Sequence, residues 1–244
     1  MIERVTDTNF LSGVSSPLLP LICVCFRFSE SNSDGVFVQL DGAENITAVL
    51  SVSNGGAVLV EIGNEVDTDE IFSFLKFSGV TSYVSDVSLN NRNEKTYKLL
   101  SGVPCFEKCC DVNTVTPESV TDEYRAVFGL LSDNSNFFEN WYSLFSKKIN
   151  NGFASAVYNR ENDTPVSTAV ATAVYGEFAV VSGVFTSPFF RNRGKASLCI
   201  KKLMSELYSV NVKKAYLWCD DGKIPFYEKL NFTVCGEIYC GEDV

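Results

Sequence analysis

The sequence predicts a fold that mixes helices and strands, of the α/β class in the broad sense that includes α+β folds. It also predicts two domains, of which the N-terminal one is the smaller. Short apolar runs separated by turn residues predict strands, and several segments carry apolar residues at the spacing of one helical face. A polar stretch that ends at Pro117 divides the chain. The 244 residues, 45% hydrophobic and 20% charged, suffice for one or two packed domains and argue against a disordered chain.

The N-terminal domain is predicted to occupy residues 1–112. The apolar segment 17–28 fits a strand or a buried helix, because its length and composition allow both. Asp67 is typical of an N-cap before an acidic first turn, and the helix that it begins should end before Gly79. Strands separated by Gly, Asn and Asp turns are expected at residues 36–40, 46–53, 57–62, 80–84 and 96–100. The scattered carboxylates of this domain indicate a solvated surface and no catalytic group.

The C-terminal domain is predicted to occupy residues 117–244, after an interdomain linker at residues 111–117. Pro117 suits the first position of a helix, whose apolar face comprises Tyr124, Val127, Phe128 and Leu131. A second helix is expected at residues 137–149, with the inward aromatic residues Phe138, Trp141, Tyr142 and Phe145. Sheet strands are expected at residues 153–158, 166–175, 178–186 and 215–219, and a last strand from Phe232.

The strand at residues 178–186 leads into a basic turn. Pro188 ends the strand because proline has no N–H to donate, and an amphipathic helix begins near Gly194. The apolar face of this helix comprises Ala196, Cys199, Ile200, Leu203 and Leu207. Five of the 20 basic residues fall in this short segment, although the chain carries a net charge of −10: Arg191, Arg193, Lys195, Lys201 and Lys202.

A turn of this kind favours an anion. The first N–H groups of a helix have no intrahelical partner, and the helix dipole adds partial positive charge there. Gly194 lets backbone and ligand approach closely, so we expect a phosphate or diphosphate group at this turn. A solvated basic loop is the alternative. A P-loop is excluded, because Phe189 stands at the first glycine position and Ala196 at the Ser/Thr position. The chain also lacks the Gly-x-Gly-x-x-Gly fingerprint of dinucleotide-binding folds.

Two motifs carry a resemblance to a known family. Arg191-x-x-Gly194-x-Ala196 resembles the Arg/Gln-x-x-Gly-x-Gly/Ala acyl-CoA loop of the GNAT-type N-acetyltransferases. The later run Ile224-Pro-Phe-Tyr-Glu-Lys-Leu-Asn-Phe232 is similar to the Tyr-Glu-Lys-Leu-Gly-Phe segment of the same family.

The match departs from the family at Asn231, which replaces the usual glycine. Asn tolerates the left-handed conformation common after a helix end, so the change is acceptable. The resemblance covers roughly residues 117–240. The element order of the first half is consistent with a degenerate copy of the same fold.

The resemblance implies a mixed, mostly antiparallel central sheet flanked by helices, and acetyl-CoA as cosubstrate without a metal. The diphosphate would rest on the amides of the turn, and the pantetheine arm would pair with the backbone of the preceding strand. Asp220 stands where many members carry an Asn that hydrogen-bonds this arm. The implied cofactor-binding residues are Val184, Phe185, Thr186, Arg191, Asn192, Arg193, Gly194, Lys195, Ala196, Ser197 and Asp220.

By the same resemblance, the protein would transfer an acetyl group to a primary amine of a small molecule or peptide, by direct attack in a ternary complex. Tyr227 matches the tyrosine that protonates the departing thiolate, and its alternative role is a core aromatic. The general base stays unassigned: Val180 falls near the position of a family Glu, Glu177 lies close by in sequence, and a water chain is a further option. A non-catalytic acyl-CoA-binding or regulatory module is the alternative function.

The nine cysteines and the absence of histidine bear on other classes of function. No Cys-x-x-Cys pair exists, although Cys105, Cys109 and Cys110 lie close in sequence. We interpret the cysteines as free thiols of a reducing compartment, with a metal or redox protein as the alternative. Without histidine, the chain cannot form a His-dependent catalytic triad.

The acidic balance argues against nucleic-acid binding and is compatible with a cationic amine acceptor. No apolar run is long enough to span a membrane, and no secretory signal is apparent, so we expect a cytoplasmic protein without a membrane partner. The identity of the amine and the oligomeric state stay open, a homodimer included.

Overall fold

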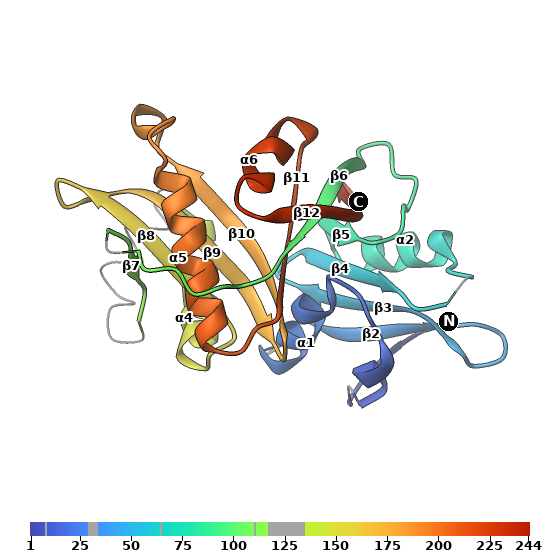
Figure 1. Ribbon diagram of the computed structural model, residues 1–244. Helices are drawn as coiled ribbons and strands as arrows, with labels where there is room; N and C mark the ends of the chain where they lie inside the picture. The colour runs from blue at the N-terminus through green and yellow to red at the C-terminus, as the bar shows by residue number, and fades with distance from the viewer. Residues whose placement is uncertain (8, 29–33, 64, 110, 117–134) are drawn as a thin grey trace. The chain divides into compact units, whose positions relative to one another are not determined.

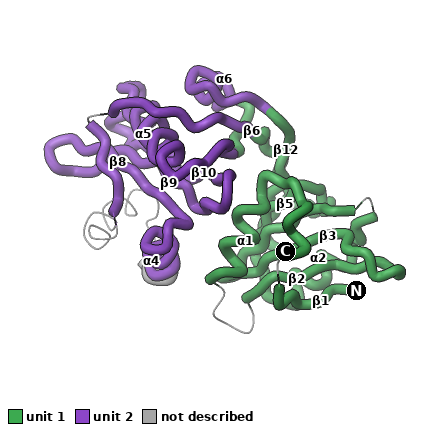
Figure 2. Tube along the Cα trace, turned by 60° about the horizontal axis from the view of Figure 1, so that its bottom comes forward, with its two compact units in different colours: residues 1–99, 218–221, 235–244 green, residues 100–217, 222–234 purple. Residues whose placement is uncertain are grey.

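The computed structural model of the protein describes residues 1–7, 9–28, 34–63, 65–109, 111–116 and 135–244, without the side chains of residues 135–141 (Figure 1). The helix expected from Pro117 lies outside these residues. The chain divides into two compact units (Figure 2). Unit 1 comprises residues 1–99, 218–221 and 235–244, and unit 2 comprises residues 100–217 and 222–234. The predicted mixed, mostly antiparallel α/β fold is confirmed.

The sheet of unit 1 has the strand order β1-β2-β3-β4-β5-β12-β6. The strands are β1 (Ile2–Arg4), β2 (Gly35–Leu40), β3 (Ile46–Ser53), β4 (Gly56–Glu61), β5 (Ser82–Ser85), β6 (Lys95–Gly102) and β12 (Phe232–Glu242). Neighbours from β1 to β4 pair antiparallel, as do β5 and β12, whereas β4 and β5 run parallel. The five strands predicted in this region are therefore confirmed to within two residues at either end.

Two α-helices belong to unit 1. The ambiguous apolar segment is helix α1 (Leu19–Phe28), preceded by a short 3-10 helix, η1 (Asn9–Gly13). Pro20 lies in the first turn of α1, where its missing N–H interrupts no helical bond. Helix α2 (Thr68–Phe77) begins as predicted, with the Asp67 side chain accepting from the backbone N–H of Glu70 at 2.9 Å. Leu50 and Leu59 of the sheet and Ile71 and Leu75 of α2 are fully buried in one core.

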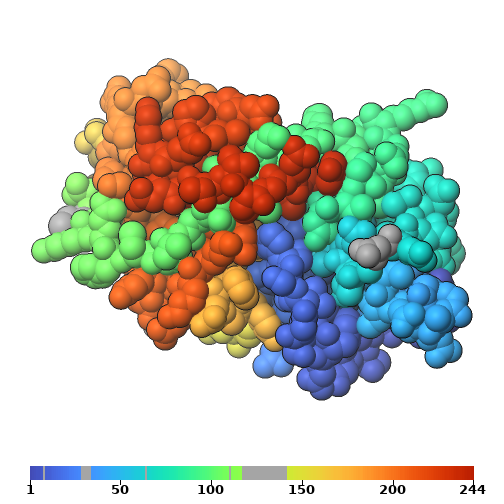
Figure 3. Space-filling model, turned by 45° about the vertical axis from the view of Figure 1, so that its right-hand side comes forward, coloured from blue at the N-terminus to red at the C-terminus, as the bar shows by residue number. Residues whose placement is uncertain are grey.

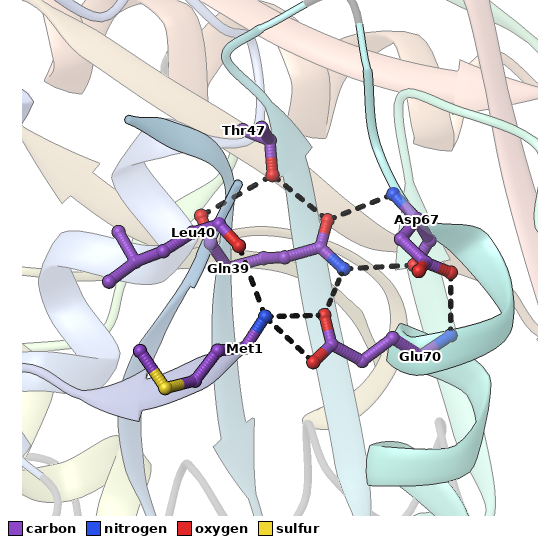
Figure 4. Close-up of polar contacts among 6 residues, drawn as sticks. All are labelled: Met1, Gln39, Leu40, Thr47, Asp67 and Glu70. Atoms are coloured by element: carbon purple, nitrogen blue, oxygen red, sulfur yellow. Dashed lines mark hydrogen bonds and ion pairs between the residues drawn. The ribbon is translucent and has the colours of Figure 1, made fainter. Parts of the chain in front are cut away.

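A buried polar cluster around Gln39 ties the sheet of unit 1 to α2 (Figure 4). Gln39 is 1% exposed. Its Oε1 accepts from Asp67 N at 3.1 Å and Thr47 Oγ1 at 2.9 Å, and its Nε2 donates to Asp67 O at 2.9 Å. Nε2 also donates to Glu70 Oε2 at 2.8 Å, which in turn accepts from the α-ammonium of Met1 at 3.0 Å. Because each polar atom of this amide is satisfied, its burial costs little.

The sheet of unit 2 has the strand order β11-β10-β9-β8-β7, with only β10 and β11 parallel. The strands are β7 (Asn113–Thr114), β8 (Ser155–Glu161), β9 (Thr164–Tyr175), β10 (Phe178–Thr186) and β11 (Lys214–Cys219), whose last residues count with unit 1. The helices are α4 (Ser135–Asn150), α5 (Lys195–Ser209) and α6 (Ile224–Glu228). The strands and helices predicted for the described part of this unit are confirmed, with small shifts at their ends.

Strand β9 is buried on both faces over most of its length. Val170 packs with Phe145 and Ile149 of α4. On the other face Ser167 hydrogen-bonds Cys199 of α5. The remaining buried residues of this second face are Ala169, Ala171 and Ala173. Their small side chains leave room for α5 to lie close to the sheet, which explains why both faces are covered.

The segment between β6 and β7 lies along α5 and is visible on the face of the molecule in Figure 3. The backbone N–H of Glu107 donates to Ser205 Oγ at 3.4 Å, and the Glu107 carboxylate pairs with Lys201 at 2.7 Å. Thr114 Oγ1 in β7 donates to Glu206 Oε1 at 3.0 Å. Residues expected to form a linker thus contribute a strand to unit 2, and the polar face of α5 is partly covered.

Candidate functional site

Strand β10 leaves its parallel neighbour early. Residues 178–180 pair with residues 214–216 of β11, and in the described chain no later residue of β10 has a β11 partner. Gly183, at φ +56°, marks a bulge at which β10 contains one extra residue relative to β9. Val184, Phe185 and Thr186, predicted to contact the cofactor, follow this bulge and are half-buried. Their outer backbone edge is of the kind to which an extended ligand can add as a strand.

The end of β10 is held by side chains. Ser167 Oγ donates to the carbonyl oxygen of Phe185 at 2.9 Å and lies 2.8 Å from Thr186 Oγ1. Arg191 Nε donates to the carbonyl oxygen of Thr186 at 3.1 Å. The guanidinium of Arg191 also lies 6.0 Å from the ring centre of Phe185. Arg191 therefore folds back onto the strand that it follows.

The turn between β10 and α5 holds a row of open amide groups. It begins with a 3-10 helix, η2 (Pro188–Phe190), and continues with Asn192 and Gly194 in the left-handed conformation, at φ +59° and +73°. The first helical bond runs from Leu198 N to Gly194 O at 3.0 Å. Within the described chain, no backbone acceptor takes the N–H groups of residues 192–197. The predicted row of unpartnered amides is thus present.

Gly194 has two separate consequences for the turn. Its φ of +73° disfavours any residue with a Cβ, so the conformation itself calls for glycine. A Cβ built on Gly194 would meet no atom within 4 Å, so the space above the backbone is open. No side chain caps the helix at this N-cap position. The residues after it, Ala196 and Ser197, are half-buried in the first turn of α5.

Helix α2 of unit 1 begins in the opposite way. Its N-cap Asp67 takes a first-turn N–H, and Asp69 and Glu70 make that turn acidic. An acidic, self-capped helix end repels anions, whereas the first turn of α5 contains no acidic residue. Of these two helix starts, only that of α5 has the open amides and the charge that a phosphate requires.

The basic residues near the turn are less free than their number suggested. Lys195 Nζ pairs with Glu161 Oε2 at 2.6 Å. Farther along α5, Lys202 pairs with Glu206 at 2.6 Å, as Lys201 does with Glu107. The predicted local excess of positive charge is therefore partly neutralised. Arg193 lies with its guanidinium 5.5 Å from the ring centre of Phe190.

Tyr227 lies in α6 and is 8% exposed. Its ring contacts Phe226 and Phe232 edge to face, with centroids 5.0 and 6.0 Å apart. These contacts would fit either a core aromatic or a buried proton donor. Asn231, just after α6, adopts the left-handed conformation expected of it, at φ +63°. Figure 1 shows α6 and the turn before α5 toward the same edge of unit 2.

The remaining candidates occupy distinct places. Asp220 is exposed and belongs to unit 1, whereas the turn before α5 belongs to unit 2. Val180 is fully buried, so no polar group occupies that position of β10. Glu177 lies at the start of β10, and the strand rise places it roughly 30 Å from the turn at the other end. Of these three residues, none stands as a general base beside the turn.

Sequence reasoning missed two residues of the site. Glu161, at the end of β8, pairs with Lys195, and Ser167 in β9 holds the end of β10. Both lie about 20 to 35 residues before the turn, and no local motif links them to it. Their involvement follows from the antiparallel pairing of β8, β9 and β10, which aligns the end of β8 with the start of β9 and the end of β10.

The other signals of the sequence lead to no second site. Eight described cysteines are free thiols, among them the buried Cys23 and Cys199 and the exposed Cys105 and Cys235. The described residues contain no group of three or more Cys, Asp or Glu side chains arranged to hold a metal ion. Among the described helices, none combines the length and apolar character of a membrane span.

Comparisons with known proteins agree with the fold. Comparison with curated proteins found no match. A GCN5-related N-acetyltransferase from Sphaerobacter thermophilus is similar at a TM-score of 0.58 and 11% identity, over 99% of this chain and 95% of that one. A GNAT-family acetyltransferase from Colwellia psychrerythraea gives 0.56 and 10%, over the whole of both chains. A GCN5-related N-acetyltransferase from Kribbella flavida gives 0.54 and 18%, over 81% and 87%.

At these identities the solved structures establish a shared fold. The family itself is indicated by a sequence model, described as the acetyltransferase (GNAT) family, that matches residues 118–232. That match spans α4, the strands β8 to β11, the turn before α5, and α6. Residues 118–232 therefore match the acetyltransferase (GNAT) family, and the resemblance indicated by the two sequence motifs is confirmed for this part of the chain.

Proposed function

We propose that residues 117–244 form an N-acetyltransferase domain that moves an acetyl group from acetyl-CoA to a primary amine of a small molecule or peptide. The observation that carries this proposal is the row of open N–H groups at residues 192–197, at the basic start of α5. Family membership supports acyl transfer, and the open amides support a diphosphate-bearing donor.

The residues around the turn suit coenzyme A in two ways. The open amides from Asn192 to Ser197 would bind the diphosphate, with Lys195 close enough to contribute its charge. The outer edge of β10 at residues 184–186 would pair with the amide groups of the pantetheine arm, because it has no β11 partner in the described chain. A backbone N–H of this edge would polarise the thioester carbonyl as a small oxyanion hole.

The chemical step needs a nucleophile, a proton donor and a proton acceptor. The amine nitrogen attacks the thioester carbonyl carbon, so that the C–N bond forms and the C–S bond breaks. Tyr227 would donate its phenolic proton to the departing thiolate, which is otherwise a poor leaving group near neutral pH. The proton lost by the amine would pass to solvent through water, because the side chain of Val180, near the position of the family's base, is apolar.

A non-catalytic acyl-CoA-binding module is the second candidate. Two observations favour it: the buried, apolar Val180 at the position near the family's base, and the packing of Tyr227 against two phenylalanine rings. Such a module would bind CoA at the turn before α5 and turn over no acetyl-CoA. The two candidates therefore share a binding site and differ in chemistry.

Unit 1 supports a further part of the proposal. Strands β2, β3, β4 and β5 with helix α2 repeat the order of β8, β9, β10 and β11 with α5, including one parallel pair around the helix. We infer that residues 1–112 derive from a degenerate copy of the same fold. Because Asp67 caps α2 and its first turn is acidic, this copy should not bind CoA. We therefore expect one CoA per chain.

Calorimetry with CoA and acetyl-CoA tests binding and stoichiometry, and an amine panel tests turnover. Free CoA should be quantified by chromatography, because Cys105 and Cys235 are exposed and would react with thiol reagents. Small amines, polyamines and a lysine peptide cover the acceptor classes. Binding of one equivalent together with CoA release on an amine supports the acetyltransferase. Binding without release on any acceptor supports the module, and no binding at millimolar ligand refutes both.

The free thiols fit a cytoplasmic protein, and size-exclusion chromatography of the same sample tests for a homodimer.

A further inference from the structure

The ion pair between Glu161 and Lys195 affects the positive charge available at the proposed anion site. The family motifs give no indication of this ion pair. Lys195 is the first residue of α5 and therefore stands among the open amides of residues 192–197. Its ammonium lies 2.6 Å from Glu161 Oε2, and its side chain is 19% exposed. Glu161 is the last residue of β8, whereas Lys195 belongs to α5. The carboxylate of Glu161 is therefore placed beside the proposed anion site.

From this geometry we propose that Glu161 competes with the diphosphate of CoA for Lys195 and thereby lowers the affinity of the site. The proposal rests on the proposed function, since it assumes that CoA binds at this turn. In the free protein Lys195 has a carboxylate partner, and a bound diphosphate would become a second anion beside the same ammonium. Two anionic groups that share one ammonium each receive only part of its attraction, so each weakens the hold of the ammonium on the other.

The surroundings of Glu161 favour this interpretation over a purely structural ion pair. Lys195 and, more weakly, Arg193 hold the pKa of the Glu161 carboxyl below its usual range, so Glu161 is charged at neutral pH. Both basic residues belong to the turn, and neither lies on β8. The pair is partly exposed, and exposed ion pairs contribute little to folding stability. Because the ion pair contributes little to folding stability, Lys195 can leave Glu161 and pair with the diphosphate when a ligand binds.

Competition of this kind has a consequence for turnover. When CoA leaves after the reaction, Lys195 returns to Glu161, so product release leaves no unpaired ammonium at the turn. Uniformly tight binding of substrate and product would raise affinity without raising turnover. Glu161 would thus act as an affinity-determining residue that is not part of the chemistry.

A double-mutant cycle measured by calorimetry with CoA tests the proposal. The variants are Glu161→Gln, Lys195→Met and the double variant, each checked for folding by circular dichroism. Competition predicts that Glu161→Gln tightens CoA binding about threefold to tenfold in the wild-type background, and by less than about twofold in the Lys195→Met background. Asp163→Asn is the matched control, because it removes the same charge two residues away in a left-handed position that Asn tolerates, and should change affinity less than twofold.

The outcomes separate this inference from the proposed function. If Glu161→Gln increased CoA affinity equally in both backgrounds, Glu161 would act by direct electrostatic repulsion of the ligand and not through Lys195. That result would overturn the proposed competition. Unchanged or weaker binding of Glu161→Gln would overturn it as well, while CoA binding by the wild type keeps the proposed function intact. A folded wild-type protein that binds no CoA would refute the proposed function, and the inference with it.

Discussion

Arg191 Nε lies 3.1 Å from the carbonyl oxygen of Thr186, so the first residue of the motif Arg191-x-x-Gly194-x-Ala196 binds the end of the strand that precedes it. The same guanidinium lies over the ring of Phe185. This contact gives Arg191 a positioning role, because it holds the edge of β10 on which the pantetheine arm would pair. A lysine keeps the charge of Arg191 but has no Nε–H in the stem and no planar guanidinium.

We therefore predict that Arg191→Lys and Arg191→Ala weaken CoA binding to a similar extent, by about threefold to tenfold. Arg193→Lys is the control, since it makes the same exchange two residues away, at a guanidinium that lies over the ring of Phe190, and should change affinity less than twofold. Calorimetry with CoA measures all three variants. If Arg191→Lys bound CoA as tightly as the wild type and Arg191→Ala bound it more weakly, Arg191 would act through its charge and not by holding the end of β10.

Replacement of Gly194 by alanine has two expected effects that can be measured separately: backbone strain, which lowers folding stability, and an added methyl group, which obstructs the ligand. Gly194 at φ +73° and Gly176 at φ +57° are both left-handed glycines with no atom within 4 Å of an added Cβ. Each Gly→Ala change should cost about 1 kcal/mol of folding stability through backbone strain, measured by urea unfolding. Gly176 lies in the turn between β9 and β10, at the other end of the sheet from the open amides.

Only Gly194→Ala should also impair the site, because its methyl group would point into the space that a diphosphate needs. We expect CoA binding to weaken at least about tenfold in Gly194→Ala, and less than about twofold in Gly176→Ala. Similar affinities for the two variants would show that the ligand does not approach the backbone at Gly194.

Tyr227→Phe tests the proposed proton donor. The ring contacts with Phe226 and Phe232 remain in this variant, so the fold should be kept. We predict that kcat falls by about 10- to 1,000-fold while the calorimetric affinity for CoA changes less than twofold, because the proposed role of the hydroxyl is to protonate the leaving thiolate. Tyr175→Phe is the control: Tyr175 stacks on Phe153 at the end of β9 and is 42% exposed. Equal turnover of Tyr227→Phe and the wild type would remove Tyr227 from the chemistry and leave it a core aromatic.

The sequence was sufficient for those parts of the fold that local patterns specify. Turn residues bracket β2, β3 and β4, and Asp67 lies at the start of α2, so these elements could be located without a structure. The left-handed Asn231 could be anticipated in the same way, since Asn tolerates that conformation. Segment 17–28 could not be decided, because a buried helix and a buried strand have the same composition over this length.

Contacts between distant segments had no sequence signal. The ion pair of Glu161 with Lys195 depends on the pairing of β8 with β9, and the cover of α5 by Glu107 depends on the course of the chain after β6. The basic run from Arg191 to Lys202 therefore seemed freer in the sequence than it is in the fold. The burial of both faces of β9 has no sequence signal for a related reason: alanine is compatible with exposure, and the position of α5 decides whether Ala169, Ala171 and Ala173 are buried.

Gln39 offers a test of the polar cluster in unit 1 that is independent of catalysis. Gln39→Met keeps the length of the side chain but leaves Asp67 N and Glu70 without the hydrogen bonds of the amide. Loss of several bonds in a buried position should lower the free energy of unfolding by about 2 to 4 kcal/mol. Urea unfolding followed by circular dichroism measures the change. Asn93→Ala is the control, because Asn93 is exposed and its side-chain amide makes one long bond at 3.3 Å, to Asp243. A variant as stable as the wild type would show that the amide contributes nothing net.

The cysteines should differ in reactivity in the order of their burial. Burial raises the pKa of the Cys23 and Cys199 thiols to about 11, so at pH 8 only about one molecule in a thousand carries either thiolate. Cys105 and Cys235 are exposed and accessible to reagent. Brief treatment of the native protein with iodoacetamide should therefore modify Cys105 and Cys235 at least about 100-fold faster than Cys199, as measured by peptide mass spectrometry. In urea the difference should disappear, because all four thiols then face solvent. Fast labelling of Cys199 in the native state would mean that α5 detaches from β9 on the time scale of the reaction, since the Cys199 side chain is fully covered where this helix lies against the sheet.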